Sequence, residues 1–332
     1  MRDLINKNLS KDYQVNILDI KPNGPVWKVN TPQGRYCIKR TRQNPSHITW
    51  LAITIEMLIS AGYPGLLPLI RNKSGYPYFE IDNNLYIVSR WLDGTTPLFT
   101  CKTHRIRIAQ TYAQLHEIAS SIRYDRTPHS RDWWSEYRKR AWFLETLKVK
   151  ILQNKKNNRI DRIILDWLKH FQLQAQVAIE GLSNAGFETW IKQPEVSGFC
   201  HNDPAPRNII IEKNWFLIDY ELSGYDLYLR ELTLLALRLL QANGWDRQIY
   251  EELLCSYQSQ RKITAEEQKF LPFLLAFPQR FWRLCSQRFQ EQLDWSERHF
   301  AAKLWEITNS EKTRLAFLCE LIPELSELNK ER

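Results

Sequence analysis

The sequence lacks the features that mark several specialised classes of protein. Its six cysteines are widely spaced and never form a C-x-x-C pair, which argues against a zinc knuckle or a disulfide framework and for a reducing compartment. No apolar run approaches the roughly 18 residues that a membrane helix needs. The N-terminal "MRDLINKNLSKDYQ" has no apolar segment typical of a signal peptide. We therefore expect a cytoplasmic protein without a membrane partner.

Positive charge is in excess but is not concentrated. The formal net charge is +9, and the densest basic cluster is the short "KKNNR" at 155–159. A positive field favours anionic partners, yet no nucleic-acid-binding motif accompanies it. We expect no nucleic-acid partner, because a solvated basic face together with a phosphate-containing small ligand explains the charge as well. With 43% apolar and 12% aromatic residues, the chain is typical of a folded globular protein.

The first part of the chain favours an antiparallel sheet. Residues 13–40 alternate apolar and polar side chains between the turn signals "NGP" and "PQG". A helical pattern follows, with Ser46 as the expected N-cap and Gly62 near its end. Strand and turn signals then return over 66–94. Residues 1–93 are therefore predicted to form a small sheet with one helix inserted after the third strand.

Helical patterns dominate from residue 100 onward, including a long stretch from 131 to 181. A pair of short strands within 208–220 interrupts them, and helices resume at about residue 226. This order predicts an α+β fold, with 1–93 as an N-terminal nucleotide-binding lobe. Residues 94–332 would form a helical lobe that carries the catalytic hairpin and the acceptor site.

The stretch "GFCHNDPAPRNIIIEKNWFLIDYE" at 198–221 carries the strongest functional signal. The runs "NIIIE" and "WFLID" predict a hairpin with polar residues at its ends. Phosphoryl transfer needs a carboxylate beside the acceptor hydroxyl, which suits Asp203 as catalytic base, and hard oxygen ligands for Mg²⁺, which suit Asn208 and Asp219. We expect His201 to brace the loop. The alternative is a surface turn whose Asp and Asn side chains satisfy their own backbone.

A nucleotide site of the kinase type also needs a lysine on the third strand and a glutamate on the next helix. "RYCIKR" supplies Lys39, and "ITIEMLI" supplies Glu56, the one acidic residue between Lys39 and Glu80. An exposed lysine and a solvated glutamate are the alternative. The connecting segment "VSRWLDGTTP" adds Ser89 and Trp91 to the predicted cofactor-binding set.

Glycine is scarce where a kinase-type site would use it. The turn "KPNGPVWKV" offers only Gly24 and no G-x-G-x-x-G loop, so fewer backbone N–H groups face a phosphate.

Glu221 could assist the metal or be solvated. Asp226 and Glu231 could brace the catalytic loop, or favour the N-terminus of the next helix; we favour structural roles for both. His116 is predicted to be packed or hydrogen-bonded.

At these residues the chain resembles the aminoglycoside phosphotransferase/choline kinase group of protein-kinase-like enzymes. The matching motifs are "HNDPAPRN", "LIDYE", "YCIKR" and the helix with "AQLHEIA". More narrowly it resembles the CotS-type spore coat branch, through "VWKVNTPQGRYCIKR", "YDLYLREL" and its length. The resemblance implies a bilobal kinase-like fold, ATP and Mg²⁺ as cofactors, and the roles given above for Lys39, Glu56, Asp203, Asn208 and Asp219. The branch often has Asp near position 231, where this chain has Glu.

Two functions remain open at this point. The first is an ATP- and Mg²⁺-dependent phosphotransferase that acts on a hydroxyl of a small molecule or sugar, which the Trp and Tyr side chains of the helical part would contact. The second is a catalytically silent scaffold component of the spore coat, with other coat proteins as partners and the coat as its location. The complete polar set favours the enzyme, and no short motif identifies the acceptor.

Overall fold

The computed structural model describes residues 2–123, 131–153 and 158–327, so residues 155–157 of the basic cluster lie outside it. The described chain forms two compact units, one of residues 1–130 and 198–231, the other of 131–197 and 232–332. The expected boundary at 93/94 divides the chain differently, because the hairpin after Asn208 clusters with the N-terminal sheet. The assignment of nucleotide and acceptor to residues 1–93 and 94–332 stays a prediction.

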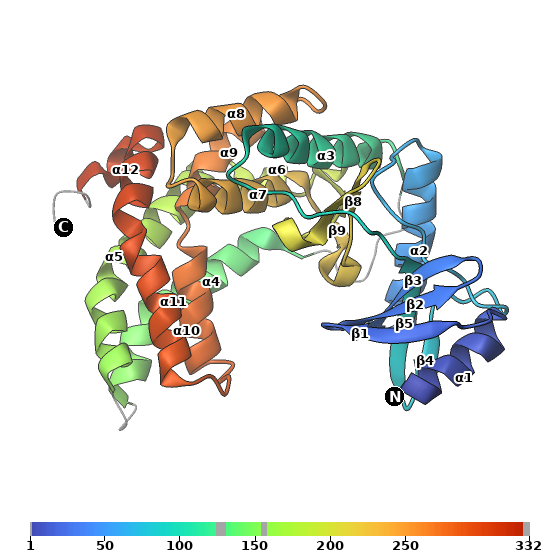
Figure 1. Cartoon of the computed structure of the whole chain (residues 1–332). Coiled ribbons are helices and arrows are strands. Elements are labelled where there is room, and N and C mark those ends of the chain that lie inside the picture. Colours follow the sequence, from blue (N-terminus) through green and yellow to red (C-terminus); the bar gives the residue numbers. More distant parts are fainter. Residues whose placement is uncertain (1, 124–130, 154–157, 328–332) are drawn as a thin grey trace. The chain divides into compact units, whose positions relative to one another are not determined.

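The first unit is built on an antiparallel five-stranded sheet in the order β1-β2-β3-β5-β4 (Figure 1). Its elements are α1 (Arg2–Tyr13), β1 (Asp19–Asn23), β2 (Val26–Thr31), β3 (Gly34–Thr41), α2 (Pro45–Ser60), β4 (Phe79–Ile81), β5 (Asn84–Arg90) and α3 (Lys102–Ser120). The predicted sheet with one helix after its third strand is confirmed. Apolar side chains of β1–β5 form the core of the sheet together with Ile5 and Leu9 of α1.

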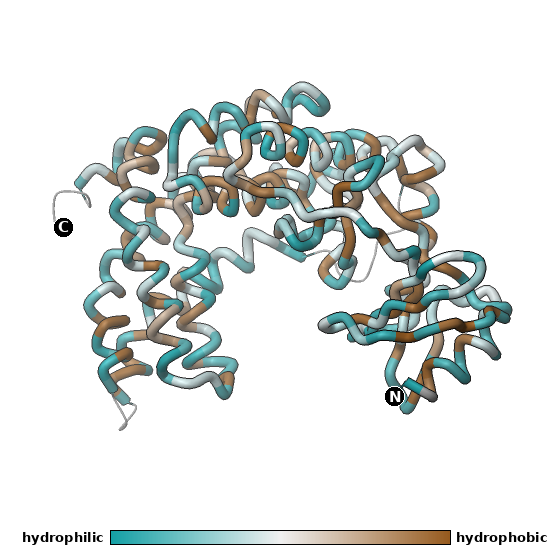
Figure 2. The backbone as a smooth tube through the Cα atoms, viewed as in Figure 1, coloured by the Kyte–Doolittle hydropathy of each residue, from teal (hydrophilic) through white to brown (hydrophobic). Residues whose placement is uncertain are grey.

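Two details of this unit differ from expectation. Asn44, rather than Ser46, caps α2, since its side chain accepts the His47 N–H at 2.8 Å. Pro45 then occupies the first turn, where a missing N–H costs nothing. Helix α1 was not expected; its signal is the pair Ile5 and Leu9, four residues apart and buried. Helix α2 buries Ile48, Leu51, Ile55 and Leu58 along its length, and Figure 2 shows brown, hydrophobic stretches in this unit.

The predicted hairpin at 208–220 is also confirmed. Strands β7 (Ile209–Ile211) and β8 (Trp215–Leu217) pair antiparallel, with Ile209 opposite Leu217. The hairpin is tied to the sheet-bearing part of the unit by Leu217 N–H, which donates to the Gly65 carbonyl at 2.8 Å, and by the bridge between Thr95 and Ile211. Strands β6 (Ser197–Cys200) and β9 (Gly224–Leu227) form a second small sheet.

The second unit is helical. Its elements are α4 (Trp133–Gln153), α5 (Arg159–Asn184), α6 (Phe187–Trp190), the C-terminal part of α7 (Tyr228–Ala242), α8 (Arg247–Gln258), α9 (Ala265–Ala276), α10 (Gln279–Phe289), α11 (Glu297–Asn309) and α12 (Glu311–Leu321). Most of its aromatic residues are core residues; Phe171 and Phe281, for example, stack with ring centroids 4.1 Å apart. No helix in the described ranges is both long enough and apolar enough to span a bilayer.

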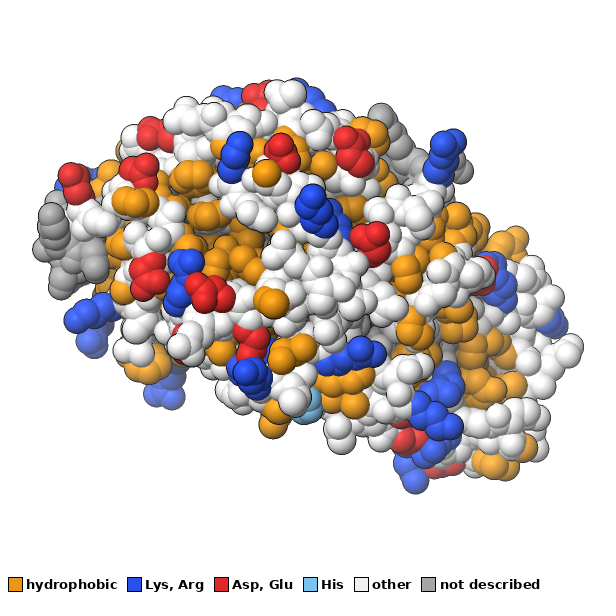
Figure 3. Space-filling view, turned by 90° about the horizontal axis from the view of Figure 1, so that it is seen from above, with side chains coloured by type: hydrophobic (Ala, Val, Ile, Leu, Met, Phe, Trp, Pro, Cys, Tyr) orange, Lys and Arg blue, Asp and Glu red, His pale blue; other side chains and the backbone are white. Residues whose placement is uncertain are grey.

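The basic residues do not gather on the face drawn in Figure 3. Lys and Arg side chains are scattered there among Asp, Glu and uncharged residues. The basic residues on this face are therefore not collected in a single patch. An extended nucleic-acid footprint needs a basic stripe or patch, which this face does not present.

Candidate active site

A cleft of about 420 Å³ lies within the first unit, between the sheet, helix α2 and the hairpin. Five of the seven residues predicted for the site line it: Lys39, Ser89, Trp91, Asn208 and Asp219. Apolar side chains such as Leu69, Ile87 and Ile218 form much of the remaining wall. A largely apolar cleft with a few convergent polar groups is the usual form of a small-molecule site.

Asp203 lies beside this cleft and is held by the hairpin. The Asn208 side chain donates to Asp203 Oδ2 at 2.7 Å and to the Asp203 carbonyl at 3.2 Å. Arg207 also donates to Oδ2, at 3.2 Å, from a side chain that is largely exposed. Because the Asn208 NH₂ group is committed to Asp203, Oδ1 is the amide atom left for a cation. The spacing of five residues thus couples the predicted base directly to a predicted metal ligand.

Asp219 and Lys39 contact each other although they lie 180 residues apart in the chain. Asp219 follows β8 and has a left-handed backbone, with φ 70° and ψ 71°. Such a conformation is uncommon for residues other than glycine and is typical of constrained functional positions. The Lys39 ammonium also lies 4.0 Å from a Glu221 carboxylate oxygen. The predicted lysine therefore faces the hairpin carboxylates.

Two buried histidines and one buried glutamate hold the loop between β6 and β7 in place. His201 donates from Nε2 to the Ile218 carbonyl at 2.8 Å, which links the loop to the residue before Asp219. Glu231 accepts the backbone N–H of His201 at 3.1 Å and that of Asn202. It also binds His116 Nε2 at 2.7 Å. The bracing role that the sequence left open for Glu231, and the packed role of His116, are both found.

Burial acts to raise the pKa of Glu231, but the hydrogen bond from His116, the charges of His116 and His201 and the Asn202 N–H outweigh it, so this pKa is lowered. Glu231 is therefore a fixed anion. His116, Cys200 and Glu231 bring possible metal-ligand atoms within 4.8 Å of one another. However, the carboxylate already serves the imidazole and two backbone groups, so we assign it to the brace.

A second brace comes from the start of α7. Arg230 donates to Asn202 Oδ1 at 2.7 Å and to Asp226 at 3.1 Å. Asn202 has a left-handed backbone, with φ 65°, which Asn adopts more readily than most residues, and the contact with Arg230 fixes its side chain. Asp226 thus has a structural role, as the sequence favoured.

Glu56 is the predicted site residue that the structure places elsewhere. Both of its carboxylate oxygens accept from the Arg71 guanidinium, at 3.0 Å each, in a pair that is partly exposed. The side of α2 that lines the cleft carries Ile48 and Leu51 instead. The expected Lys39–Glu56 pair is therefore not formed. The sequence argument failed because it counted only acidic residues as competitors, whereas Arg71 competes for the glutamate.

The segment after β5 is fixed around Trp91. Its backbone N–H donates to the Arg35 carbonyl at 2.9 Å, and its indole donates to Asp93 at 3.1 Å. The Lys28 ammonium lies 4.6 Å from the ring centroid and also pairs with Asp93 at 3.3 Å. Trp91 is thus held in place as part of the cleft wall. Ser89 lines the cleft near the end of β5, where it lies opposite Cys37 of β3.

The turn between β1 and β2 covers the cleft with few donors. Asn23, Pro25 and Val26 line the cavity, and Gly24 has φ +59°. Pro25 has no N–H, so this turn offers less of the backbone nest that grips phosphate in glycine-rich loops. The structure therefore has the same shortage of phosphate-facing N–H groups in this turn that the sequence predicts.

This arrangement has the protein-kinase-like fold of small-molecule phosphotransferases. An aminoglycoside phosphotransferase from Alicyclobacillus acidocaldarius is similar with a TM-score of 0.81 at 20% identity, covering 96% of each chain. The microcompartment-associated aminopropanol kinase has a TM-score of 0.69 at 12% identity over 99% of each chain. The choline kinase LicA from Streptococcus pneumoniae has a TM-score of 0.56 at 15% identity, covering 95% of this chain and 99% of that one. The expected fold class is confirmed.

Within this fold, a model of one particular family matches nearly the whole chain. Residues 6–321 match the family described as "Spore coat putative kinase YutH", and the chain belongs to this family. The resemblance to the CotS-type spore coat branch is thereby confirmed.

Proposed function

We propose that the protein is an ATP- and Mg²⁺-dependent phosphotransferase that transfers the γ-phosphoryl group to a hydroxyl of a small molecule or sugar. The observation that carries the proposal is the convergence of Lys39, Asn208 and Asp219 on one cleft, with Asp203 hydrogen-bonded to Asn208. Similar folds give it support: a spectinomycin phosphotransferase is known with ADP and spectinomycin, and an amicoumacin kinase with AMP-PNP and Ca²⁺.

The donor set suits magnesium. Asn208 Oδ1 and the Asp219 carboxylate are hard oxygen ligands on one hairpin, and such atoms are the ones that Mg²⁺ prefers. When bound, the ion would neutralise charge on the β- and γ-phosphate oxygens. Lys39 would then exchange its contact with Asp219 for the α- and β-phosphates. Ser89 and Trp91 would hold the adenine end against the apolar wall.

Asp203 would act on the acceptor. Its carboxylate takes the proton of the acceptor hydroxyl while the new oxygen–phosphorus bond forms and the bond to the β-phosphate oxygen breaks, releasing ADP. Asn208 and Arg207 keep Oδ2 oriented. Glu231 and His201 hold the loop in place, so that little rearrangement is needed during reaction.

The experiment is a panel of hydroxyl-bearing metabolites and sugars incubated with ATP and Mg²⁺ and read by mass spectrometry for a gained phosphate. We expect phosphorylation of a subset of the panel. Asp203→Asn should lower turnover by about 10²–10⁴-fold while the affinity for nucleotide stays within about threefold. The matched control is Asp294→Asn on an exposed loop, which should leave turnover unchanged. Equal turnover in Asp203→Asn and the parent would contradict the proposed base.

A second candidate is a non-catalytic scaffold of the spore coat. The contact of Lys39 with Asp219 and Glu221 and the single glycine in the β1–β2 turn favour it. The family description names the spore coat, so either function would place the protein there, with other coat proteins as partners. Fractionation of spores that carry the tagged chain tests this location. Nucleotide binding without transfer to any panel member, and coat assembly that is unaffected by Asp203→Asn, would favour the scaffold.

A further inference from the structure

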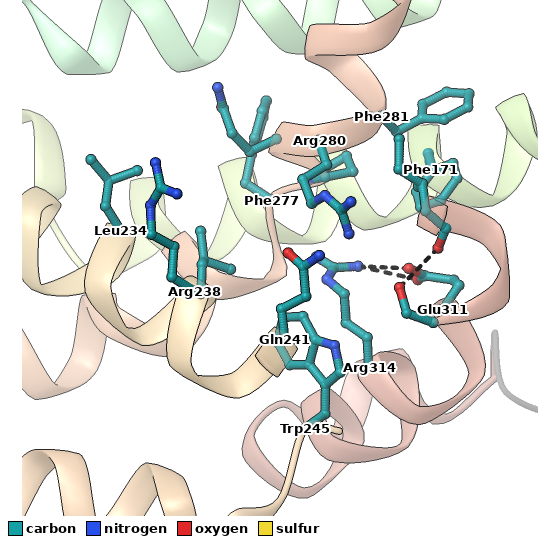
Figure 4. A pocket seen from close by; sticks show the side chains of 15 residues that line it. Phe171, Leu234, Arg238, Gln241, Trp245, Phe277, Arg280, Phe281, Glu311 and Arg314 are labelled. Atoms are coloured by element: carbon teal, nitrogen blue, oxygen red, sulfur yellow. Dashed lines mark hydrogen bonds and ion pairs between the residues drawn. The ribbon is translucent and has the colours of Figure 1, made fainter. Parts of the chain in front are cut away.

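The second unit contains a cavity of its own, of about 270 Å³. Helix α7 supplies Leu234, Arg238 and Gln241 to its wall, and the start of α10 supplies Arg280. Figure 4 shows the side chains of Gln241, Arg280 and Arg314 directed toward its centre. None of the residues that line it belongs to the first unit, so the cavity is independent of the proposed nucleotide cleft.

The walls of this cavity are aromatic and aliphatic. Phe171, Phe277, Phe281 and Trp245 line it, and each is at most 6% exposed. The indole Nε1–H of Trp245 is buried and has no hydrogen-bond partner in the described part of the chain. Figure 4 draws this nitrogen on the side of the ring that faces Gln241 and Arg314. A buried donor without a partner is costly, and a ligand oxygen in the cavity would satisfy it.

The acceptors at this site are already in use. The Glu311 carboxylate accepts from Arg314 at 3.1 and 3.2 Å, from Gln174 at 2.5 Å and from His170 at 3.0 Å. Arg314 in turn donates to the Leu275 and Ala276 carbonyls at 3.0 and 2.7 Å. Glu311 and Arg314 therefore form a closed structural cluster. Most of the hydrogen bonds to the Glu311 carboxylate are thus made within this cluster.

Arg280 is the cation that this cluster leaves under-compensated. It pairs with Glu306 at 3.3 Å, but that carboxylate is exposed and is shared with Lys303, also at 3.3 Å. In the orientation that satisfies both groups, the Gln241 amide oxygen accepts from the Arg280 guanidinium at 2.9 and 3.2 Å. Burial lowers the pKa of Arg280, helped by the like charge of Arg314, although the carboxylates of Glu306 and Glu311 act in the opposite direction. The guanidinium is thus positioned at the cavity with a single ion-pair partner, which is exposed.

We propose that this cavity binds a small organic anion, whose carboxylate or phosphate pairs with Arg280 and accepts from Trp245 and whose apolar body lies against the phenylalanines. The lining carries three guanidinium groups and one carboxylate, and Glu306 outside it pairs with Arg280, so hydrogen-bond donors predominate at the cavity. The cavity volume of about 270 Å³ is at the small end of the range for ligand sites. It suits a ligand whose apolar part is about the size of one ring. The planar guanidinium of arginine can donate two parallel hydrogen bonds to either a carboxylate or a phosphate.

The test is calorimetric titration of the full chain, without nucleotide or Mg²⁺, with phenyl phosphate, benzoate and the uncharged benzyl alcohol. We expect saturable binding of at least one anion and none of benzyl alcohol; the two anions separate a phosphate from a carboxylate ligand. Arg280→Gln should weaken binding about tenfold or more, as expected for a lost charge-assisted hydrogen bond. Arg283→Gln, on the same helix but exposed and outside the cavity, should leave the affinity within about twofold.

Leu234→Trp provides a second variant, because it adds bulk at the cavity wall without removing a charge. It should abolish binding of the anion, while its melting temperature checks that the fold is intact. Absence of saturable binding for both anions overturns the proposal, as does unchanged affinity in both Arg280→Gln and Leu234→Trp. Since the titration contains no nucleotide, its outcome is independent of whether the chain transfers phosphate.

Discussion

Replacement of Glu231 by Gln tests the brace beneath the catalytic loop. Glu231 is fully buried, and its carboxylate serves His116 and the backbone N–H groups of His201 and Asn202. Glutamine keeps one oxygen but turns an amide NH₂ toward a donor, and it removes the charge from a buried pair. Each charged hydrogen bond is worth about 1.5–3 kcal/mol, and breaking a buried pair costs about 3–5 kcal/mol. We therefore expect Glu231→Gln to destabilise the protein by about 3 kcal/mol.

That loss converts into a measurable shift in thermal unfolding. With an unfolding entropy of about 2.1 cal/mol/K per residue, about 3 kcal/mol lowers Tm by roughly 4 °C if the chain unfolds as one. The shift is roughly twice as large if the first unit unfolds by itself. Tryptophan fluorescence during heating measures it. A shift of less than about 1 °C at neutral pH would refute the assignment of Glu231 to a charged brace.

The same residue predicts a pH dependence. Because folding lowers the pKa of Glu231, its contribution is fully present above the ordinary glutamate pKa of about 4.3. The contribution is lost as pH falls through the folded-state pKa. The difference in Tm between the parent and Glu231→Gln should therefore be constant from neutral pH down to about 5 and should shrink below about 4.

Three further predictions follow from the first unit. Glu56→Gln should cost no more than about 1 kcal/mol, because its pair with Arg71 is partly exposed, and calorimetry should find nucleotide affinity unchanged; a large loss of affinity would instead restore Glu56 as the partner of Lys39. Gly94→Ala should cost about 1–3 kcal/mol, since an added Cβ would lie 2.0 Å from the Ile211 carbonyl oxygen, whereas Gly224→Ala, with open space around it, should be neutral in the same denaturant titration. Burial raises the pKa of Cys37 to about 11, so at pH 8 a disulfide reagent should modify it at least about tenfold more slowly than the exposed Cys255; peptide mapping measures both rates, and equal rates at the two cysteines would contradict this.

The fold was largely predictable because its signals are local. Alternating strands, turn residues and the apolar runs around Asn208 are read from neighbouring positions, and the sheet, its inserted helix and the hairpin all follow from them. Residues 66–78 show the limit of such signals. The run 66–70 is apolar and mostly buried, yet β4 starts only at Phe79, because Leu67 and Leu69 line the cleft and Pro68 cannot donate to a ladder.

The site was predictable where the residue type is demanded by chemistry and not where partners are chosen by packing. Lys39, Asn208 and Asp219 were predicted because phosphate and Mg²⁺ restrict which side chains can serve, and the structure places all three around one cleft. Glu56 was assigned by its position on a helix, but the sequence does not record that Arg71 lies nearer. The anion cavity carries no motif at all, since its residues come from five separate helices and from the loops between helices.

The central claim is that the cleft of the first unit holds a nucleotide through magnesium, and calorimetric titration of ATP with and without Mg²⁺ tests it most directly. We predict saturable binding that requires Mg²⁺ in the parent and is weakened at least about tenfold in Asp219→Asn, with Asp203→Asn close to the parent. Binding that is absent in the parent, or that is indifferent to both Mg²⁺ and Asp219, would contradict the account.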